Sequence, residues 1–280
     1  MWLKASSEIT PSVPGWFVMA PLTMWTESSF RAALERDEFE LFYQPQVLGD
    51  GRTIAGAEAL IRHIAADGTV TGPTQFIAAF ERLGFIDELT RYSFPRVCEA
   101  AVRWPGLSIA VNLSPTEFRL HGLVERLVGT AQAAGADPRQ IEIEITEGLF
   151  FDDPDRAESM LTDLRKAGFS IALDDFGTGY SSLAYLLRFP VDKIKIDRSF
   201  VKDVPGSLKA ASIVHALIAL ARAIGLKVVA EGVETEEQRI FLKSAGCHLQ
   251  QGYLFSTPVP VRVFETLLAK SKAAASPVFK

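Results

Sequence analysis

The sequence predicts an α/β fold in which eight strands alternate with helices and close into a barrel. Three observations support this prediction: short β-rich apolar runs are separated by segments of helical length, polar residues stand at the ends of seven of these runs, and glycines follow several helical segments. A length of 280 residues is ordinary for one such barrel, so a second domain is not required. A doubly wound sheet is the alternative topology.

The strand predictions follow the apolar, β-rich runs. They cover residues 40–47, 53–60, 107–113, 140–146, 169–174, 191–196, 226–230 and 248–254. The first two runs are separated only by the sequence LGDGR, which is typical of a hairpin turn. At least one strand is therefore expected to run antiparallel, which makes this a modified barrel.

The helix predictions lie between most of these strands. They cover residues 27–37, 74–81, 86–103, 115–134, 155–167, 181–187, 207–224 and 234–245. Several helical runs end at a glycine, as a C-terminal cap should, namely at Gly135, Gly168, Gly225 and Gly246. The barrel is expected to span residues 27–270, preceded by a poorly structured leader or linker (1–26) and followed by a loose tail (271–280).

Alternation within the strands predicts which face of the barrel is charged. In residues 141–145 three isoleucines oppose Glu142 and Glu144, and in residues 191–197 apolar residues oppose Lys193 and Lys195. The apolar faces are expected to pack against the helices, which leaves small or charged residues pointing inward. Buried carboxylates are costly unless they are paired or bound to metal, so this pattern favours bound cations.

Seven polar residues at the ends of the apolar runs are the candidate site. They are Glu58, Asn112, Glu144, Asp174, Lys195, Glu231 and Gln251. In barrels of this class, polar residues at the carboxyl ends of strands indicate chemistry, whereas those at the opposite ends indicate stability. If the strands close into one ring, these side chains converge on one mouth, where they would hold divalent cations and act on an anionic substrate.

The oxygen ligands in this set favour Mg²⁺ or Mn²⁺ over Zn²⁺ or Ca²⁺. Asp174 is followed by Asp175, and two adjacent carboxylates can bridge two ions, with Glu231 completing the second. Two ions about 3.5–4 Å apart activate a water and stabilise an in-line displacement at phosphorus. The alternative is that Asp174 and Asp175 only open the turn that follows them.

Three further residues have both a chemical and a structural interpretation. Lys195 either orients the attacking water, or takes its proton, or pairs structurally with Asp174 or Glu144. Glu147 either holds the glycine-rich loop that begins at Gly177 or is a carboxylate at a helix start. Arg62 either grips a phosphate or is a surface arginine.

Composition argues against several other functions. The net charge is −5 without a basic stretch, which argues against binding to duplex nucleic acid. The four histidines lack metal-binding spacing, and the two cysteines do not suggest a disulfide framework, so a reducing cytoplasmic location is expected. No apolar run reaches transmembrane length, so direct membrane insertion is not expected.

Eight motifs, in order, resemble the EAL-domain family of cyclic di-GMP phosphodiesterases. Residues 58–62 read EALIR and look like the motif that names the family. The resemblance covers about residues 27–270, and its other segments are Tyr43–Pro45, Val111–Pro115, Glu144–Glu147, Asp174–Leu183, Val191–Asp197, Ala230–Thr235 and Gln251–Tyr253. A single motif would be weak evidence, but eight in the family's order are specific.

The resemblance implies a modified TIM barrel that hydrolyses one phosphodiester of cyclic di-GMP to give linear pGpG. It implies one ion held by Glu58, Asn112, Glu144 and Asp174, and a second held by Asp174, Asp175 and Glu231. By the same resemblance Lys195 would position the water, Glu147 would hold the Asp175 loop, and Arg62 and Gln251 would contact the substrate or support the site. Family members often form homodimers, so a homodimer is expected.

Two other functions remain open at this point. A catalytically inactive cyclic di-GMP receptor would keep the fold, but such modules usually lose one or more ligand carboxylates, and all are present here. An unrelated metal-dependent barrel enzyme, for example one acting on enolates, would explain the carboxylates but not the order of the motifs. For the phosphodiesterase, Ca²⁺ is expected to inhibit, because it cannot hold the compact octahedral geometry of Mg²⁺.

Overall fold

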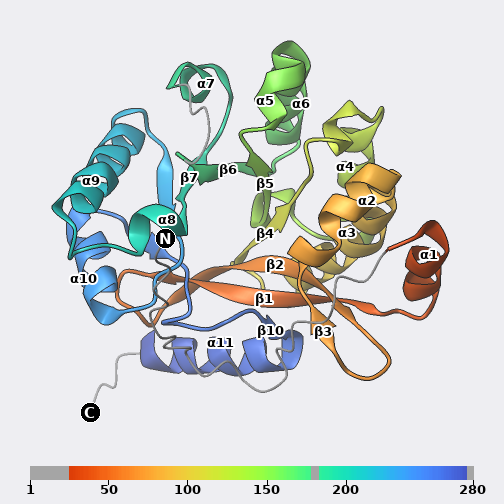
Figure 1. The fold of residues 1–280 in the computed structure, drawn as a ribbon, viewed down its shortest axis with the longest axis horizontal. Helices are drawn as coiled ribbons and strands as arrows, with labels where there is room; N and C mark the ends of the chain where they lie inside the picture. Colours follow the sequence, from red (N-terminus) through yellow and green to blue (C-terminus); the bar gives the residue numbers. More distant parts are fainter. Residues whose placement is uncertain (1–24, 178–182, 276–280) are drawn as a thin grey trace, which may run out of the picture.

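The computed structural model describes residues 25–177 and 183–275, and it contains a closed, mixed barrel of eight strands (Figure 1). Around the barrel the order is β1-β9-β8-β7-β6-β5-β4-β2, and β2 pairs with β1 to close the ring. β1 runs antiparallel to both neighbours, while every other pair in the ring is parallel. The predicted barrel with one antiparallel strand is confirmed, and the doubly wound alternative is wrong.

The strands that form the ring lie close to the predicted ranges. They are β1 (Phe39–Leu48), β2 (Ile54–Ile64), β4 (Ser108–Asn112), β5 (Ile141–Thr146), β6 (Ser170–Phe176), β7 (Lys193–Ile196), β8 (Lys227–Ala230) and β9 (Leu249–Gln250). Two short additional strands, β3 (Val70–Thr71) and β10 (Val259–Pro260), pair with β2 and β1. The largest difference from prediction is β9, which keeps only two of the seven residues expected in 248–254.

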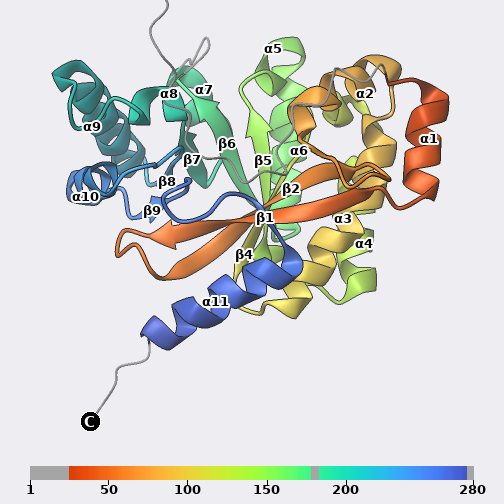
Figure 2. The ribbon, with the colours of Figure 1, turned by 60° about the horizontal axis from the view of Figure 1, so that its bottom comes forward.

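Helices cover the outside of the barrel (Figure 2). They are α1 (Glu27–Glu35), η1 (Pro73–Gln75), α2 (Ile77–Leu83), α3 (Ile86–Arg103), η2 (Glu117–Arg119), α4 (Leu123–Ala134), η3 (Pro138–Gln140), α5 (Leu149–Asp152), α6 (Pro154–Lys166), α7 (Leu183–Arg188), α8 (Arg198–Val201), α9 (Leu208–Ala223), α10 (Glu236–Ala245) and α11 (Val261–Ala275). None of these described helices is long and apolar enough to cross a membrane.

The end of the chain differs from the sequence prediction. α11 extends to Ala275, so residues 271–275 are helical, and the prediction of a loose tail from residue 271 is wrong for them. Phe264 on this helix is buried between Tyr43 and Trp104, with ring centroids 5.8 and 4.7 Å away. The predicted leader falls almost entirely outside the described residues, as do residues 276–280.

The two faces of the strands carry different kinds of side chain, as alternation predicts. Ile109, Ile141, Ile143, Ile171 and Ile194 are completely buried in the core that joins the barrel to its helices. The inward positions beside them on β5 and β7 carry charged residues that are also buried. The barrel lumen is therefore polar, unlike the branched apolar lumen of most barrels of this class.

The hairpin between β1 and β2 fixes the register that brings polar residues together. Asp50 accepts hydrogen bonds from the backbone N–H groups of Arg52 (2.8 Å) and Thr53 (2.9 Å), which holds the turn. The strands then pair so that Gln44 lies opposite Glu58. Both side chains point into the lumen, so a local turn determines the position of two residues at the mouth of the barrel.

Candidate metal centre

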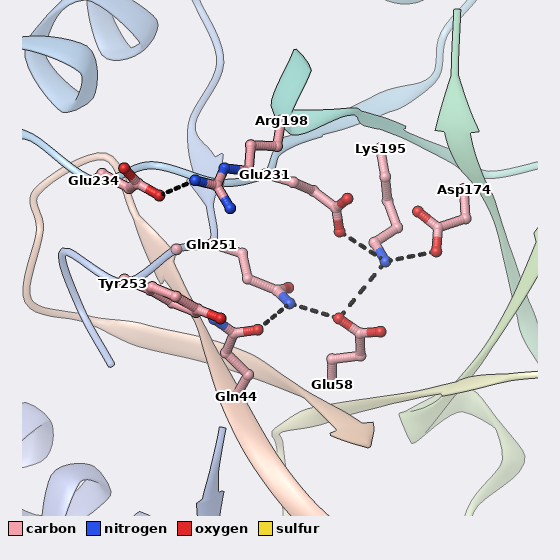
Figure 3. Close-up of a pocket in the computed structure, with 11 residues that line it drawn as sticks. Gln44, Glu58, Asp174, Lys195, Arg198, Glu231, Glu234, Gln251 and Tyr253 are labelled. Atoms are coloured by element: carbon pink, nitrogen blue, oxygen red, sulfur yellow. Dashed lines mark hydrogen bonds and ion pairs between the residues drawn. The ribbon is translucent and has the colours of Figure 1, made fainter. Parts of the chain in front are cut away.

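The seven polar residues predicted from the strand ends converge on one mouth of the barrel. Figure 3 shows five of them, Glu58, Asp174, Lys195, Glu231 and Gln251. Glu58 comes from β2, Glu144 from β5, Asp174 from β6 and Lys195 from β7. Asn112 ends β4, and Glu231 and Gln251 directly follow β8 and β9. Since β2 and the strands from β4 to β9 run parallel around the ring, their carboxyl ends meet at the same rim.

Lys195 is the centre of this cluster and is almost completely buried. Its Nζ lies 2.8 Å from Glu144 Oε2, 2.8 Å from Glu231 Oε1 and 3.1 Å from Asp174 Oδ2. A fourth carboxylate oxygen, Glu58 Oε2, is 3.7 Å away. An ammonium group has only three hydrogen-bond donors, so four carboxylates compete for one cation.

Glu58 is oriented by two amide side chains. Asn112 Nδ2 donates to Glu58 Oε1 (2.7 Å), and Gln251 Nε2 donates to Glu58 Oε2 (2.5 Å). Gln251 Nε2 also donates to Gln44 Oε1 (3.1 Å). Gln44 is not among the predicted site residues, although alternation along β1 is a signal that places it on the inward face. Asn112 and Gln251 therefore hold the carboxylate of Glu58 in a fixed orientation.

Burial and mutual repulsion shift the pKa values of these acids. Burial raises the pKa of Glu231 to about 8, and burial together with the charge of Glu58 raises the pKa of Glu144 well above its usual range. Burial opposes ionisation of Glu58 as well, but Lys195 and the hydrogen bond from Gln251 outweigh it and lower its pKa. Burial alone would lower the pKa of Lys195, yet Glu144 and Glu231 raise it well above the usual value, so Lys195 is an ammonium ion.

The charge balance of the mouth fits two divalent cations. Five carboxylates and one ammonium leave four negative charges when all are ionised, and two divalent ions would balance them. Oxygen atoms of Glu58, Glu144 and Asp174 lie within 4.8 Å of one another, and so do oxygens of Asp174, Asp175 and Glu231. Among the described residues, the buried Glu144 Oε1 has no hydrogen-bond partner, which leaves it available as a ligand. Asp174 belongs to both groups, and its role as a bridging ligand remains a prediction.

Asp175 reaches the second group through an uncommon backbone conformation. Its φ is 54°, which is in the left-handed region that few residues other than glycine adopt. Its N–H donates to Asp174 Oδ1 (2.9 Å), so the two adjacent acids are connected through the backbone. Burial and the neighbouring Asp174 raise the pKa of Asp175. Strained conformations of this kind are concentrated at functional sites.

Comparison with known proteins gives the family of the chain. The model of the EAL domain matches residues 27–258. The chain belongs to the EAL domain family. Its curated relatives include the "Cyclic di-GMP phosphodiesterase NbdA" of Pseudomonas aeruginosa, 40% identical over 266 residues, which cover 93% of this chain and 34% of that protein. Another is the "Signaling protein YkoW" of Bacillus subtilis, 37% identical over 246 residues, which cover 86% of this chain and 31% of that protein.

Solved structures agree with the assignment to the EAL domain family. One described as "PaMucR Phosphodiesterase, c-di-GMP complex" has a TM-score of 0.80 and 37% identity, with 85% of this chain and 98% of that chain covered. A "calcium/cy-diGMP complex" of Klebsiella pneumoniae BlrP1 has a TM-score of 0.70 and 35% identity, with 79% and 56% covered. The chain spans about a third of the length of the curated relatives it matches.

The resemblance assigned a supporting role to two further residues, Glu147, next to the start of the glycine-rich loop, and Arg62, on the strand that carries Glu58. Glu147 Oε1 accepts a hydrogen bond from the N–H of Gly177 (3.4 Å), where the glycine-rich loop begins. Residues 178–182 of that loop lie outside the described residues. Arg62 is buried, and its Nη1 donates to the carbonyl of Ile61 (2.9 Å). Burial lowers the pKa of Arg62, and the charge of Glu58 opposes that effect.

Several residues at the rim of the mouth were not predicted from the sequence. A cavity of about 260 Å³ is lined by Lys195 and Glu231 and also by Arg198, Glu234 and Tyr253. Arg198 Nη2 lies 2.7 Å from Glu234 Oε1, and Tyr253 is 60% exposed. Glu234 follows Glu231 by three residues and Tyr253 follows Gln251 by two, so proximity to the motifs was an available signal.

A second, more apolar cavity of about 560 Å³ also adjoins the candidate metal centre, because Asp174 lines both cavities. Its walls include Ile77, Ile86 and Leu89, and its inner end is formed by Asn112, Asp174 and Asp175. Glu117 also lines this cavity, and burial raises the pKa of Glu117 to about 7. The candidate centre thus adjoins both a polar cavity and a mostly apolar one.

Proposed function

We propose that this chain hydrolyses one phosphodiester bond of cyclic di-GMP, giving linear pGpG, at a centre of two divalent cations. The observation that carries the proposal is the pair of carboxylate groups that share Asp174 beside the buried Lys195. The names of curated relatives and of a complexed EAL structure support cyclic di-GMP as the ligand. The adjoining apolar cavity supports a substrate with an aromatic base.

Glu58, Asn112, Glu144 and Asp174 would hold one ion, and Asp174, Asp175 and Glu231 the other. We propose Mg²⁺ or Mn²⁺, because the candidate ligands are hard oxygen donors. Bound cations supply an activated water and offset the charge that develops at phosphorus. Without them, the net negative charge of the mouth would repel a phosphodiester, so the carboxylates alone are a poor binding site for this substrate.

The chain's own residues would orient and hold the reacting groups. Lys195 is an ammonium ion among carboxylates, which favours a role as a hydrogen-bond donor that positions the attacking water over a role as its base. Glu147 would hold the loop that follows Asp175 through the N–H of Gly177. Gln251 would hold the carboxylate of Glu58 in its orientation through their hydrogen bond. Arg62 would either support the site or contact the substrate.

An inactive cyclic di-GMP receptor is the second candidate function, because a binding module can have the same fold and ligand. The presence and convergence of every predicted ligand carboxylate favours the enzyme. The two functions differ in one measurement, which is whether pGpG appears when the chain is incubated with cyclic di-GMP and Mg²⁺ or Mn²⁺.

The test compares the wild-type chain with Glu58→Ala and with Glu99→Ala. Glu99 is an exposed residue on α3, away from the metal-ligand groups, so its removal controls for the loss of one acidic side chain. We expect pGpG from the wild type and from Glu99→Ala, and none from Glu58→Ala. Binding of cyclic di-GMP by the wild type without any pGpG would support the receptor and contradict the enzyme.

The homodimer and the cytoplasmic location remain predictions. Sedimentation velocity of the chain with and without cyclic di-GMP would measure the first. A species of twice the chain's mass of 30.7 kDa is expected, and a monomer at all concentrations would contradict it.

A further inference from the structure

A cavity of about 560 Å³ lies at the amino end of the barrel, opposite the acidic mouth. Ser108, Ser170, Lys193 and Lys227, at or near the first residues of β4, β6, β7 and β8, line it. Its volume is within the range of about 300–1,000 Å³ that is typical of small-molecule sites. None of the residues of the candidate metal centre lines this cavity, so it is a separate space.

The charged residues around this cavity are mainly cations. Four cations line it against two carboxylates. Both carboxylates are already paired, Glu142 with Lys193 (2.6 Å) and Asp192 with Arg165 (2.8 Å). In contrast, the side chains of Arg222 and Lys227 make no hydrogen bond or ion pair with any described residue. The cavity therefore has two cations whose charge is not balanced nearby.

A buried hydrogen-bond donor also lacks a partner here. Gln46, on the inner face of β1, lines the cavity and is 1% exposed. Its Nε2 has no hydrogen-bond partner in the described part of the chain. A buried donor without an acceptor is destabilising, so an acceptor supplied from outside the chain would remove that cost. This amide and the unbalanced cations point to the same kind of ligand, which is an anion with several acceptor oxygens.

We propose that this cavity binds a phosphomonoester of nucleotide size. A phosphate dianion accepts many hydrogen bonds, and an arginine fork, an ammonium group and an amide together provide the donors for it. Leu48, Leu226 and Leu249 form an apolar part of the wall, where the organic part of the ligand would lie. The site is independent of the metal centre, and it does not depend on the proposed phosphodiesterase activity.

Isothermal titration calorimetry with AMP tests the proposal directly. The full chain is titrated in EDTA, because without cations the acidic mouth repels phosphate and does not compete for the probe. We expect AMP to bind at a single site at millimolar concentration, and adenosine not to bind. No binding of AMP, or equal binding of adenosine, would overturn the proposal, because recognition would then not involve the phosphate.

Substitutions at the rim locate the binding site. The double variant Arg222→Gln/Lys227→Gln should bind AMP at least about tenfold more weakly, because it removes two cations that would contact the phosphate. Lys209→Gln is the matched control, since Lys209 is an exposed lysine at the other end of α9. Unchanged affinity of the double variant, or equal loss in the control, would overturn the assignment to this cavity.

Gln46→Met separates binding from folding. Methionine keeps the approximate length of the side chain and removes the unpartnered donor, so thermal stability without ligand should stay the same or rise. AMP affinity should fall several-fold in the same variant. A variant that is less stable and binds AMP as well as the wild type would contradict the role of Gln46 as a ligand donor.

Discussion

Two layers of charge lie inside the barrel, two residues apart on the same strands. In the lower layer Glu142 of β5 faces Lys193 of β7, and in the upper layer Glu144 faces Lys195. Both oxygens of Glu142 lie within 2.8 Å of Lys193 Nζ, so the lower pair is complete by itself. In the upper layer Lys195 is shared among four carboxylates. The comparison indicates that a buried glutamate–lysine pair is structural where its charges balance. Where additional carboxylates leave an excess of negative charge, the same residue types form a candidate site for cations.

The largest expected effect separates the two lysines by activity. Lys195→Ala should lower kcat about 10²–10⁴-fold with little change in KM, because the ammonium group acts on the attacking water and not on substrate binding. Steady-state kinetics with cyclic di-GMP and Mn²⁺ provide the measurement. An unchanged kcat would assign Lys195 to structure, as Lys193 is, and would remove the functional difference between the layers.

The lower pair should show its effect in stability. Either Lys193→Met or Glu142→Leu alone leaves a buried charge without a partner and should reduce the free energy of unfolding by about 3–5 kcal/mol. The double variant replaces both charges with apolar groups and should recover most of that loss, as measured by urea denaturation. Its turnover should remain close to that of the wild type. A double variant that folds but has lost turnover would show that the lower layer takes part in the chemistry.

Calcium tests whether the upper layer needs compact ions. Replacing Mg²⁺ by Ca²⁺ should slow turnover at least about tenfold, because Ca²⁺ takes more ligands at longer and more flexible distances. Binding of cyclic di-GMP, measured by calorimetry, should persist in Ca²⁺, which separates a loss of chemistry from a loss of binding. Full turnover in Ca²⁺ would contradict the proposed two-ion arrangement.

The sequence predicted the upper layer because its signals are local. Each ligand stands at the end of an apolar run, and alternation along β5 and β7 shows that Glu144 and Lys195 point inward. The helix predicted at residues 86–103 has the same bounds in the structure. The antiparallel strand followed from the five-residue turn between the first two runs.

Some features that depend on contacts distant in sequence were not predicted. Gln44 is separated from Gln251 by 207 residues, and only the closed ring brings their side chains together. The number of carboxylates that share Lys195 likewise depends on the register of neighbouring strands. α11 is a different case, because Phe264, Leu268 and Ser271 repeat at helical spacing and are buried. This helical spacing is visible in the sequence, but the helix was not predicted, and Pro258 and Pro260 directly precede it.

The smallest expected effect is a dependence of stability on pH that arises in the upper layer. Burial raises the pKa of Glu231 from an ordinary value of 4.5 to about 8, so the folded state holds this proton more tightly than the unfolded state. The resulting stabilisation is complete below about pH 4.5 and is lost as the pH rises through about 8. Thermal unfolding in EDTA should therefore occur at progressively lower temperature between these values. The raised pKa of Glu144 acts in the same direction.

Glu231→Gln keeps the neutral form of this side chain at every pH. The variant should match the wild type near pH 5 and unfold at a higher temperature than the wild type above pH 8, by a few degrees, since about 1 kcal/mol corresponds to about 2–4 °C in a domain of this size. Saturating Mg²⁺ should flatten the wild-type profile as well, because bound cations favour the ionised carboxylates of the upper layer. Profiles of equal slope for wild type and variant would show that Glu231 is ionised without metal, and that Lys195 alone balances the acids around it.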